Sequence, residues 1–127
     1  MSGSADSDST RGFLAKARDN ETVIIPRAFS QERQFASAVA EVEKMLYPQV
    51  LRIRYSLDDD WMGEPAVFFR ILLSEAASRR DQLLTATKQA SRALEEQIEP
   101  LEQWGVVPYF NFRSQSEQAA LREEAWA

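Results

Sequence analysis

The sequence of 127 residues contains neither cysteine nor histidine. Without cysteine it forms no disulfide, offers no thiolate nucleophile and builds no thiolate zinc site. Without histidine, histidine-dependent catalytic triads, histidine general bases, a histidine pH switch and most transition-metal sites are excluded. We therefore expect a protein that is not an enzyme and that uses no cofactor.

Long apolar runs are also missing. No stretch approaches the ~18 apolar residues that a membrane helix needs, and the first twenty residues hold neither the apolar region nor the cleavage site of a signal peptide. We expect a flexible leader over residues 1–20, a cytoplasmic location and no membrane contact.

Composition is that of a soluble globular domain, with 44% hydrophobic and 28% charged residues. At this length one domain with a single modest core is expected. The formal net charge of -5 argues against a whole surface that grips nucleic acid or acidic lipid, although it leaves room for a local basic patch.

Hydrophobic periodicity predicts alternating strands and helices. The β-branched run Thr22–Ile25 favours a strand that ends at Pro26, although it is the weakest of the strands. Pro100 should end or kink the longer helix, and Gly105 suits the turn that follows it. The expected elements are a strand over 22–26, a helix over 31–47, strands over 50–57 and 66–73, a helix over 76–99 and a strand over 106–112.

This order of elements predicts an α+β fold of the ferredoxin-like type (βαββαβ), an antiparallel sheet with two helices on one face. The α+β domain would span residues 21–114, and residues 115–127 would add a C-terminal helical tail. If residues 22–26 are only a loop, the remainder is a three-stranded α+β domain with similar packing.

Alternation within the strands sorts the two faces of the sheet. Apolar residues at positions 51, 53, 55, 57, 67, 69, 71, 73, 110 and 112 should face the helices. The opposite face should carry Arg52, Arg54, Phe68, Arg70, Leu72, Tyr109, Asn111 and Arg113. Three interpretations compete for that face: a cover of protein, a platform for single-stranded RNA, and recognition of an anionic metabolite. Protein is preferred, because the central strand lacks the glycine-flanked aromatic signature of RNA-recognition domains.

The stretch "DDDWMGEP" forms the loop between the two central strands. Its acids, Asp58, Asp59, Asp60 and Glu64, could hold a magnesium or calcium ion through oxygen ligands. The loop lacks a phosphate cradle and the spaced oxygens of an EF-hand, which favours an exposed acidic turn instead. Trp61 and Met62 either fold back on the core or contact a partner, since aromatic residues are enriched at binding hot spots.

The tail begins with "SQSE", in which Ser114 and Glu117 have the spacing of a capping box. The helix it starts has a narrow apolar stripe of Ala120, Leu121 and Ala125 beside Trp126. We expect the tail either to fold over the open sheet face, where Arg113 could meet Glu123 and Glu124, or to dock on a partner.

These features predict a small non-catalytic protein-binding module: a homo-oligomer, a subunit, or a neutralising regulatory partner of a larger effector. The expected contact residues are Trp61, Met62, Arg52, Arg54, Arg70, Tyr109, Arg113, Leu121 and Trp126. One alternative is single-stranded nucleic-acid binding through Arg52, Arg54, Arg70 and Tyr109. The other is a metal-dependent enzyme that uses Asp58 and Asp60. No particular small molecule is indicated.

Overall fold

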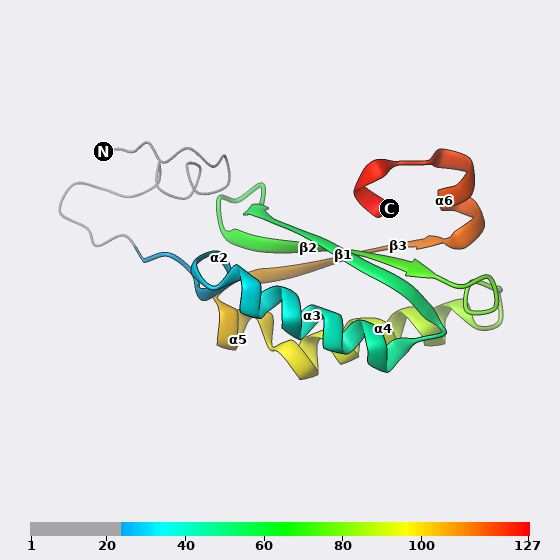
Figure 1. The fold of residues 1–127 in the computed structure, drawn as a ribbon, viewed down its shortest axis with the longest axis horizontal. Helices are drawn as coiled ribbons and strands as arrows, with labels where there is room; N and C mark the ends of the chain where they lie inside the picture. Colours follow the sequence, from blue (N-terminus) through cyan, green and yellow to red (C-terminus); the bar gives the residue numbers. More distant parts are fainter. Residues whose placement is uncertain (1–23) are drawn as a thin grey trace.

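A computed structural model describes residues 24–127, which form a three-stranded sheet with helices on one face and the end of the chain on the other (Figure 1). The expected leader and the first two residues of the run Thr22–Ile25 lie outside the described residues. Within the described part of the chain, no helix has the length and apolar character needed to cross a membrane.

The sheet is mixed. β1 (Val50–Asp59) and β2 (Pro65–Leu73) form an antiparallel hairpin, and β3 (Val107–Ser114) pairs with β2 in parallel. The order β1-β2-β3 makes β2 the central strand. Because parallel neighbours need a long crossover, the whole segment 74–106 passes over one face of the sheet between β2 and β3.

The sequence prediction of a ferredoxin-like antiparallel sheet is therefore not confirmed, whereas the broader α+β class is. Ile24 and Ile25 belong to no strand and expose 74% and 45% of their surface. In a ferredoxin-like sheet the first strand separates the last two; here β3 pairs directly with β2. Strand propensity expresses packing on a sheet face, and β3 has taken the place beside β2 that this run would have used.

The helices cover one face of the sheet (Figure 1). After the short α2 (Arg27–Ser30), α3 (Glu32–Leu46) buries Phe35, Val39 and Val42. α4 (Leu83–Ile98) starts later than expected, since turns occupy residues 75–82. Its buried side chains keep the predicted helical spacing: Ala86, Ala90, Leu94 and Ile98.

Proline and glycine set the end of this helical layer. α4 stops at Ile98 because Glu99 adopts the left-handed conformation with φ of 54°, and Pro100 begins α5 (Pro100–Trp104). Gly105, with φ of 72°, ends α5 as expected. The chain then enters β3 through the buried Val106.

An aromatic cluster centred on Phe35 joins the helices to the sheet. Its ring lies 5.2 Å from Trp104 and 5.1 Å from Tyr55, both edge to face, and 6.4 Å from Phe69. Burial beside Glu32, whose carboxylate accepts a hydrogen bond from the Tyr55 hydroxyl (3.3 Å), raises the pKa of Tyr55 to about 12. The cluster ties α3, α5, β1 and β2 into one core.

Strand alternation correctly predicts the side chains that face the helices, with one exception. The buried ones are Ile53, Val67, Phe69, Ile71 and Leu73, and the partly buried ones are Tyr55, Leu57, Phe110 and Phe112. The exception is Leu51, because a bulge between Val50 and Arg52 shifts the register of β1. Val50 lies opposite Leu73, is 1% exposed and takes the core position expected for Leu51. An inserted residue of this kind cannot be recognised from alternation alone.

Candidate functional site

The open face of the sheet is covered in part by the tail segment, residues 115–127 (Figure 1). α6 (Gln115–Leu121) begins at the predicted capping box: Ser114 Oγ accepts from the Glu117 amide (3.1 Å), and Glu117 Oε1 accepts from the Ser114 amide (2.7 Å). Arg122 then turns left-handed, with φ of 54°, and ends the helix. The short 3-10 helix η1 (Glu124–Trp126) follows and packs on β2. The α-helix of the tail thus ends at Leu121, whereas the sequence predicted a helical tail over residues 115–127.

Two arginines on the open face bind the backbone of this segment. Arg54 Nε donates to the backbone oxygen of Ala127 (2.6 Å), and Arg70 Nε donates to that of Ala125 (2.7 Å). Arg70 also donates to Ser56 Oγ (2.7 Å). Burial, together with the nearby charge of Arg54, lowers the pKa of Arg70. An arginine pKa starts so high that the guanidinium stays charged at neutral pH and remains a donor only.

Arg113 makes the densest set of contacts. Its Nη2 lies 2.7 Å from Glu123 Oε1, its Nη1 donates to Gln118 Oε1 (2.9 Å), and its guanidinium lies 4.4 Å from the centre of the Trp126 ring. The contact expected between Arg113 and Glu123 is therefore present. Trp126 is only 8% exposed, whereas Leu121, expected on the same apolar stripe, is 57% exposed.

Arg52 differs from the other three arginines. It lies opposite Leu72 across the β1–β2 pair, and its Nε is enclosed without a hydrogen-bond partner among the described residues. We name the surface formed by Arg52, Arg54, Arg70 and Arg113 the arginine face. Leu72, 3% exposed, lies on the same face, outside the main core cluster.

The second predicted contact region is the loop 60–64 between β1 and β2, here named the Trp61 loop. Asp60 organises it: Asp60 Oδ1 accepts from the amides of Met62 (2.9 Å) and Glu64 (2.9 Å), and Oδ2 accepts from the Tyr109 hydroxyl (2.8 Å). The hydrogen bond to Asp60 raises the pKa of Tyr109. Gly63 supports the turn with φ of 82°. The loop is therefore held in one conformation by both its own backbone and β3.

Trp61 and Met62 project from this loop into solvent, with exposures of 79% and 71%. The Trp61 ring lies 5.6 Å from that of Tyr109, and Tyr109 stacks on Phe68 at 5.2 Å. The sequence left open whether Trp61 folds back on the core; in the structure it does not. The loop and the tail segment lie toward opposite ends of the sheet (Figure 1).

Two of the acids in and next to the loop, Asp60 and Asp58, accept structural hydrogen bonds. Both oxygens of Asp60 accept hydrogen bonds, and Asp58 Oδ1 accepts from the Asp59 amide (2.8 Å). Among residues 24–127, no group of three or more acidic side chains is placed to hold a metal ion. The metal-dependent alternative gains no support from this loop.

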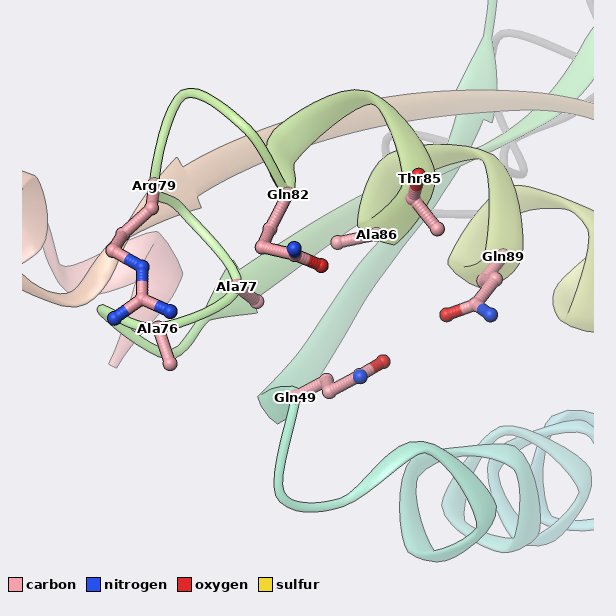
Figure 2. A pocket seen from close by; sticks show the side chains of 8 residues that line it. All are labelled: Gln49, Ala76, Ala77, Arg79, Gln82, Thr85, Ala86 and Gln89. Carbon is pink, nitrogen blue, oxygen red and sulfur yellow. The ribbon is translucent and has the colours of Figure 1, made fainter.

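Two hollows, the second of which borders the arginine face at Arg113, also lack an evident reactive group. One, of about 160 Å³, lies between α4 and the start of β1, and Figure 2 shows the amide side chains of Gln49, Gln82 and Gln89 around it. Amides cannot exchange protons as acids or bases at neutral pH. The other, of about 730 Å³, contains Glu75 and Glu117, but their carboxylates accept from the Ser116 amide (2.6 Å) and the Ser114 amide. Both carboxylates fix the start of α6.

Sequence reasoning placed the four arginines on one face and anticipated the pair of Arg113 with Glu123, but it missed the backbone oxygens that Arg54 and Arg70 bind. The reversal at Arg122 carries no sequence signal, because glycine and asparagine are the usual residues at that conformation. Asp60 was interpreted as part of an exposed acidic turn or as a metal ligand, and its hydrogen bonds to the turn amides and to Tyr109 were missed, although aspartate is a known turn residue for this reason.

Comparison with protein-family models, curated proteins and solved structures finds no match to this chain.

Proposed function

We propose that this protein is a non-catalytic protein-binding module whose contact with a partner centres on Trp61 and Met62. The observation that carries the proposal is an almost fully exposed tryptophan on a loop held by hydrogen bonds. Tryptophan and methionine are enriched in the buried centres of interfaces. A loop already fixed in one conformation loses little entropy on binding, which favours affinity.

The charges around Trp61 define the partner. Asp58 and Glu64 are exposed beside the two apolar side chains, so the matching surface is an apolar pocket bordered by lysine or arginine. Complementary charges of this kind raise association rates and exclude wrong partners. A larger basic protein whose activity this acidic chain neutralises fits this description.

Nucleic-acid binding on the open sheet face is less favoured. Arg54, Arg70 and Arg113 already bind the tail segment. The aromatic stack of Phe68 and Tyr109 lies beside the acidic Trp61 loop, whose carboxylates would repel phosphates.

Affinity purification of tagged protein from its native cells tests the proposal. The wild-type protein should retain a companion that survives gel filtration, and Trp61→Ala should reduce its recovery at least tenfold. Leu84→Ala is the matched control, because Leu84 is 67% exposed on α4 and should leave recovery unchanged. Since both side chains are exposed, each variant should keep its stability within ~0.5 kcal/mol.

The native mass of the protein in cell extract can contradict the proposal. A wild-type protein that runs as a lone monomer in cell extract contradicts the proposal, as does equal recovery with Trp61→Ala. If the pure protein is a dimer that Trp61→Ala dissociates, the pocket lies on a second copy of this chain.

A further inference from the structure

We propose that the arginine face is a peptide-recognition surface, occupied here by residues 122–127 of the same chain, and that an acidic, tryptophan-containing segment of a partner protein can replace them. The inference concerns a different surface from the Trp61 loop and does not depend on that contact.

The backbone contacts have the pattern of peptide recognition. Arg54 and Arg70 bind the backbone oxygens of Ala127 and Ala125, two residues apart, and the intervening Trp126 is buried. Hydrogen bonds to backbone oxygens hold a peptide irrespective of its sequence, while a pocket for the buried side chain between them selects the residue. Alanine at 125 and 127 contributes only backbone atoms to these two hydrogen bonds.

Two side chains would give the surface its selectivity. Trp126 lies against the Arg113 guanidinium, an arrangement in which the cation and the aromatic ring attract each other. Glu123, three residues earlier, pairs with Arg113 Nη2 at 2.7 Å, and Gln118 Nε2 holds its backbone oxygen at 2.8 Å. The preferred ligand is thus a short segment with an acid three positions before a tryptophan and small residues around it.

The tail segment is attached weakly enough to be exchanged. Trp126 is its one buried residue, α6 buries none, and no tail residue belongs to the main core cluster. Release of the segment would therefore leave the core packing in place, as in local opening of a small cooperative unit. The buried Leu72 lies on the same face, between Arg52 of β1 and Arg113 of β3 in the strand register.

Because the tail segment is tethered to the arginine face, a free peptide displaces it only at high concentration. A segment linked by a few residues is present at an effective concentration of about 1 mM, so a free peptide at micromolar concentration competes poorly with it. Loss of the Trp126 contact in the chain should remove that competition.

A labelled peptide of residues 122–127 (REEAWA), titrated into full-length protein by fluorescence anisotropy, tests the proposal. Binding to Trp126→Ala should be at least about tenfold tighter than to wild type, because the tethered competitor is weakened. The same peptide with alanine in place of tryptophan should not bind. Adding Arg113→Gln to Trp126→Ala should abolish binding, whereas adding Arg79→Gln, at an exposed position outside this face, should not.

A second variant guards against misfolding. If Trp126→Ala loses its circular dichroism spectrum, Glu123→Lys weakens the tethered segment by charge repulsion from Arg113 and leaves Trp126 intact. It too should bind the peptide more tightly than wild type does. No gain of peptide binding in a folded variant overturns the proposal.

A titration with a single-stranded RNA oligonucleotide distinguishes peptide binding from nucleic-acid binding at the arginine face. If the folded variants bind RNA and not the peptide, the arginine face is a phosphate platform and the proposal is wrong. Trp61→Ala should leave the peptide titration unchanged, so failure here and failure of the Trp61 contact are distinguishable.

Discussion

Gly105 has a backbone conformation that few other residues adopt. Its φ of 72° ends α5, and a side chain at this position would lie 3.2 Å from the Pro26 Cβ. The positive φ favours glycine, and any Cβ at this position would require Pro26 to shift slightly. Gly105 thereby brings the end of α5 into contact with Pro26, the residue before α2.

Gly105→Ala should destabilise the protein by about 1–3 kcal/mol, since left-handed backbone strain alone costs about 1–2 kcal/mol with a Cβ present. Urea unfolding followed by tryptophan fluorescence measures the change. Asparagine tolerates a positive φ better than alanine does, so the stability of Gly105→Asn should fall between those of the wild type and Gly105→Ala. Because both variants carry a Cβ near Pro26, the difference between them measures the backbone strain alone. Unchanged stability in Gly105→Ala would show that Pro26 moves away freely.

Residues with strong local stereochemistry could be interpreted from the sequence. The longer helix ends before Pro100 and Gly105 adopts a positive φ, both as predicted, although the segment between them is a short helix and not the expected turn, and Ser114 with Glu117 forms the predicted capping box. Arg122 could not be recognised, because nothing local requires an arginine to adopt a positive φ. That single residue directs Trp126 back over the sheet, so the cover of the arginine face stayed one of two alternatives.

At the scale of elements, the cap of α6 is sensitive to pH. The hydrogen bonds that Glu117 shares with Ser114 lower the pKa of the Glu117 carboxyl. A carboxyl with a lowered folded-state pKa stabilises the fold above its unfolded value of about 4.3 and loses that contribution as the pH falls through the folded value. We expect α6 to loosen as the pH falls below the ordinary range of a glutamate carboxyl.

NMR chemical shifts of the α6 amides between pH 2 and 6 measure this transition. Glu117→Gln keeps an acceptor for the Ser114 amide but has no charge, so its part of the pH response should vanish. Glu123→Gln removes the charge that pairs with Arg113, so it identifies the part of the pH response that comes from Glu123. A Glu117→Gln titration identical to wild type would contradict the assignment.

The strands show where sequence reasoning ends. Alternation within β1, β2 and β3 correctly separated the helix-facing side chains from the arginines, because alternation is a local property of extended chain. Which strands are neighbours is not local, and Ile24 and Ile25, the described residues of the run that was expected to form a first strand, belong to no strand. The bulge at Leu51 was missed for the same reason, since it is defined only by pairing with β2.

At the scale of the whole molecule, the two halves of the sheet should form at different stages of folding. β1 and β2 are joined by the short Trp61 loop, whereas β3 reaches β2 only after the segment 74–106 is in place. Closing a longer loop costs more entropy before its contacts form. The hairpin with α3 should therefore be structured in the transition state and β3 only later.

Stopped-flow kinetics in urea check this order. Ile53→Val in β1 should mainly slow folding, and Phe112→Leu in β3 should mainly speed unfolding. Both side chains belong to the helix-facing side of the sheet, which makes the pair comparable. The reverse partition would place the parallel pairing first.

The parallel pairing also has a consequence during synthesis on the ribosome. At 5–20 residues per second, residues 74–106 take about 2 to 7 seconds to make. Because each residue leaves the exit tunnel with the same delay after its synthesis, the hairpin spends about this interval outside the tunnel before β3 emerges. During that time the β3-facing edge of the apolar β2, "PAVFFRILL", has no strand to pair with. An uncovered apolar edge is a template for aggregation, so we expect the nascent chain to need a chaperone most in this interval, before the first residue of β3 leaves the exit tunnel.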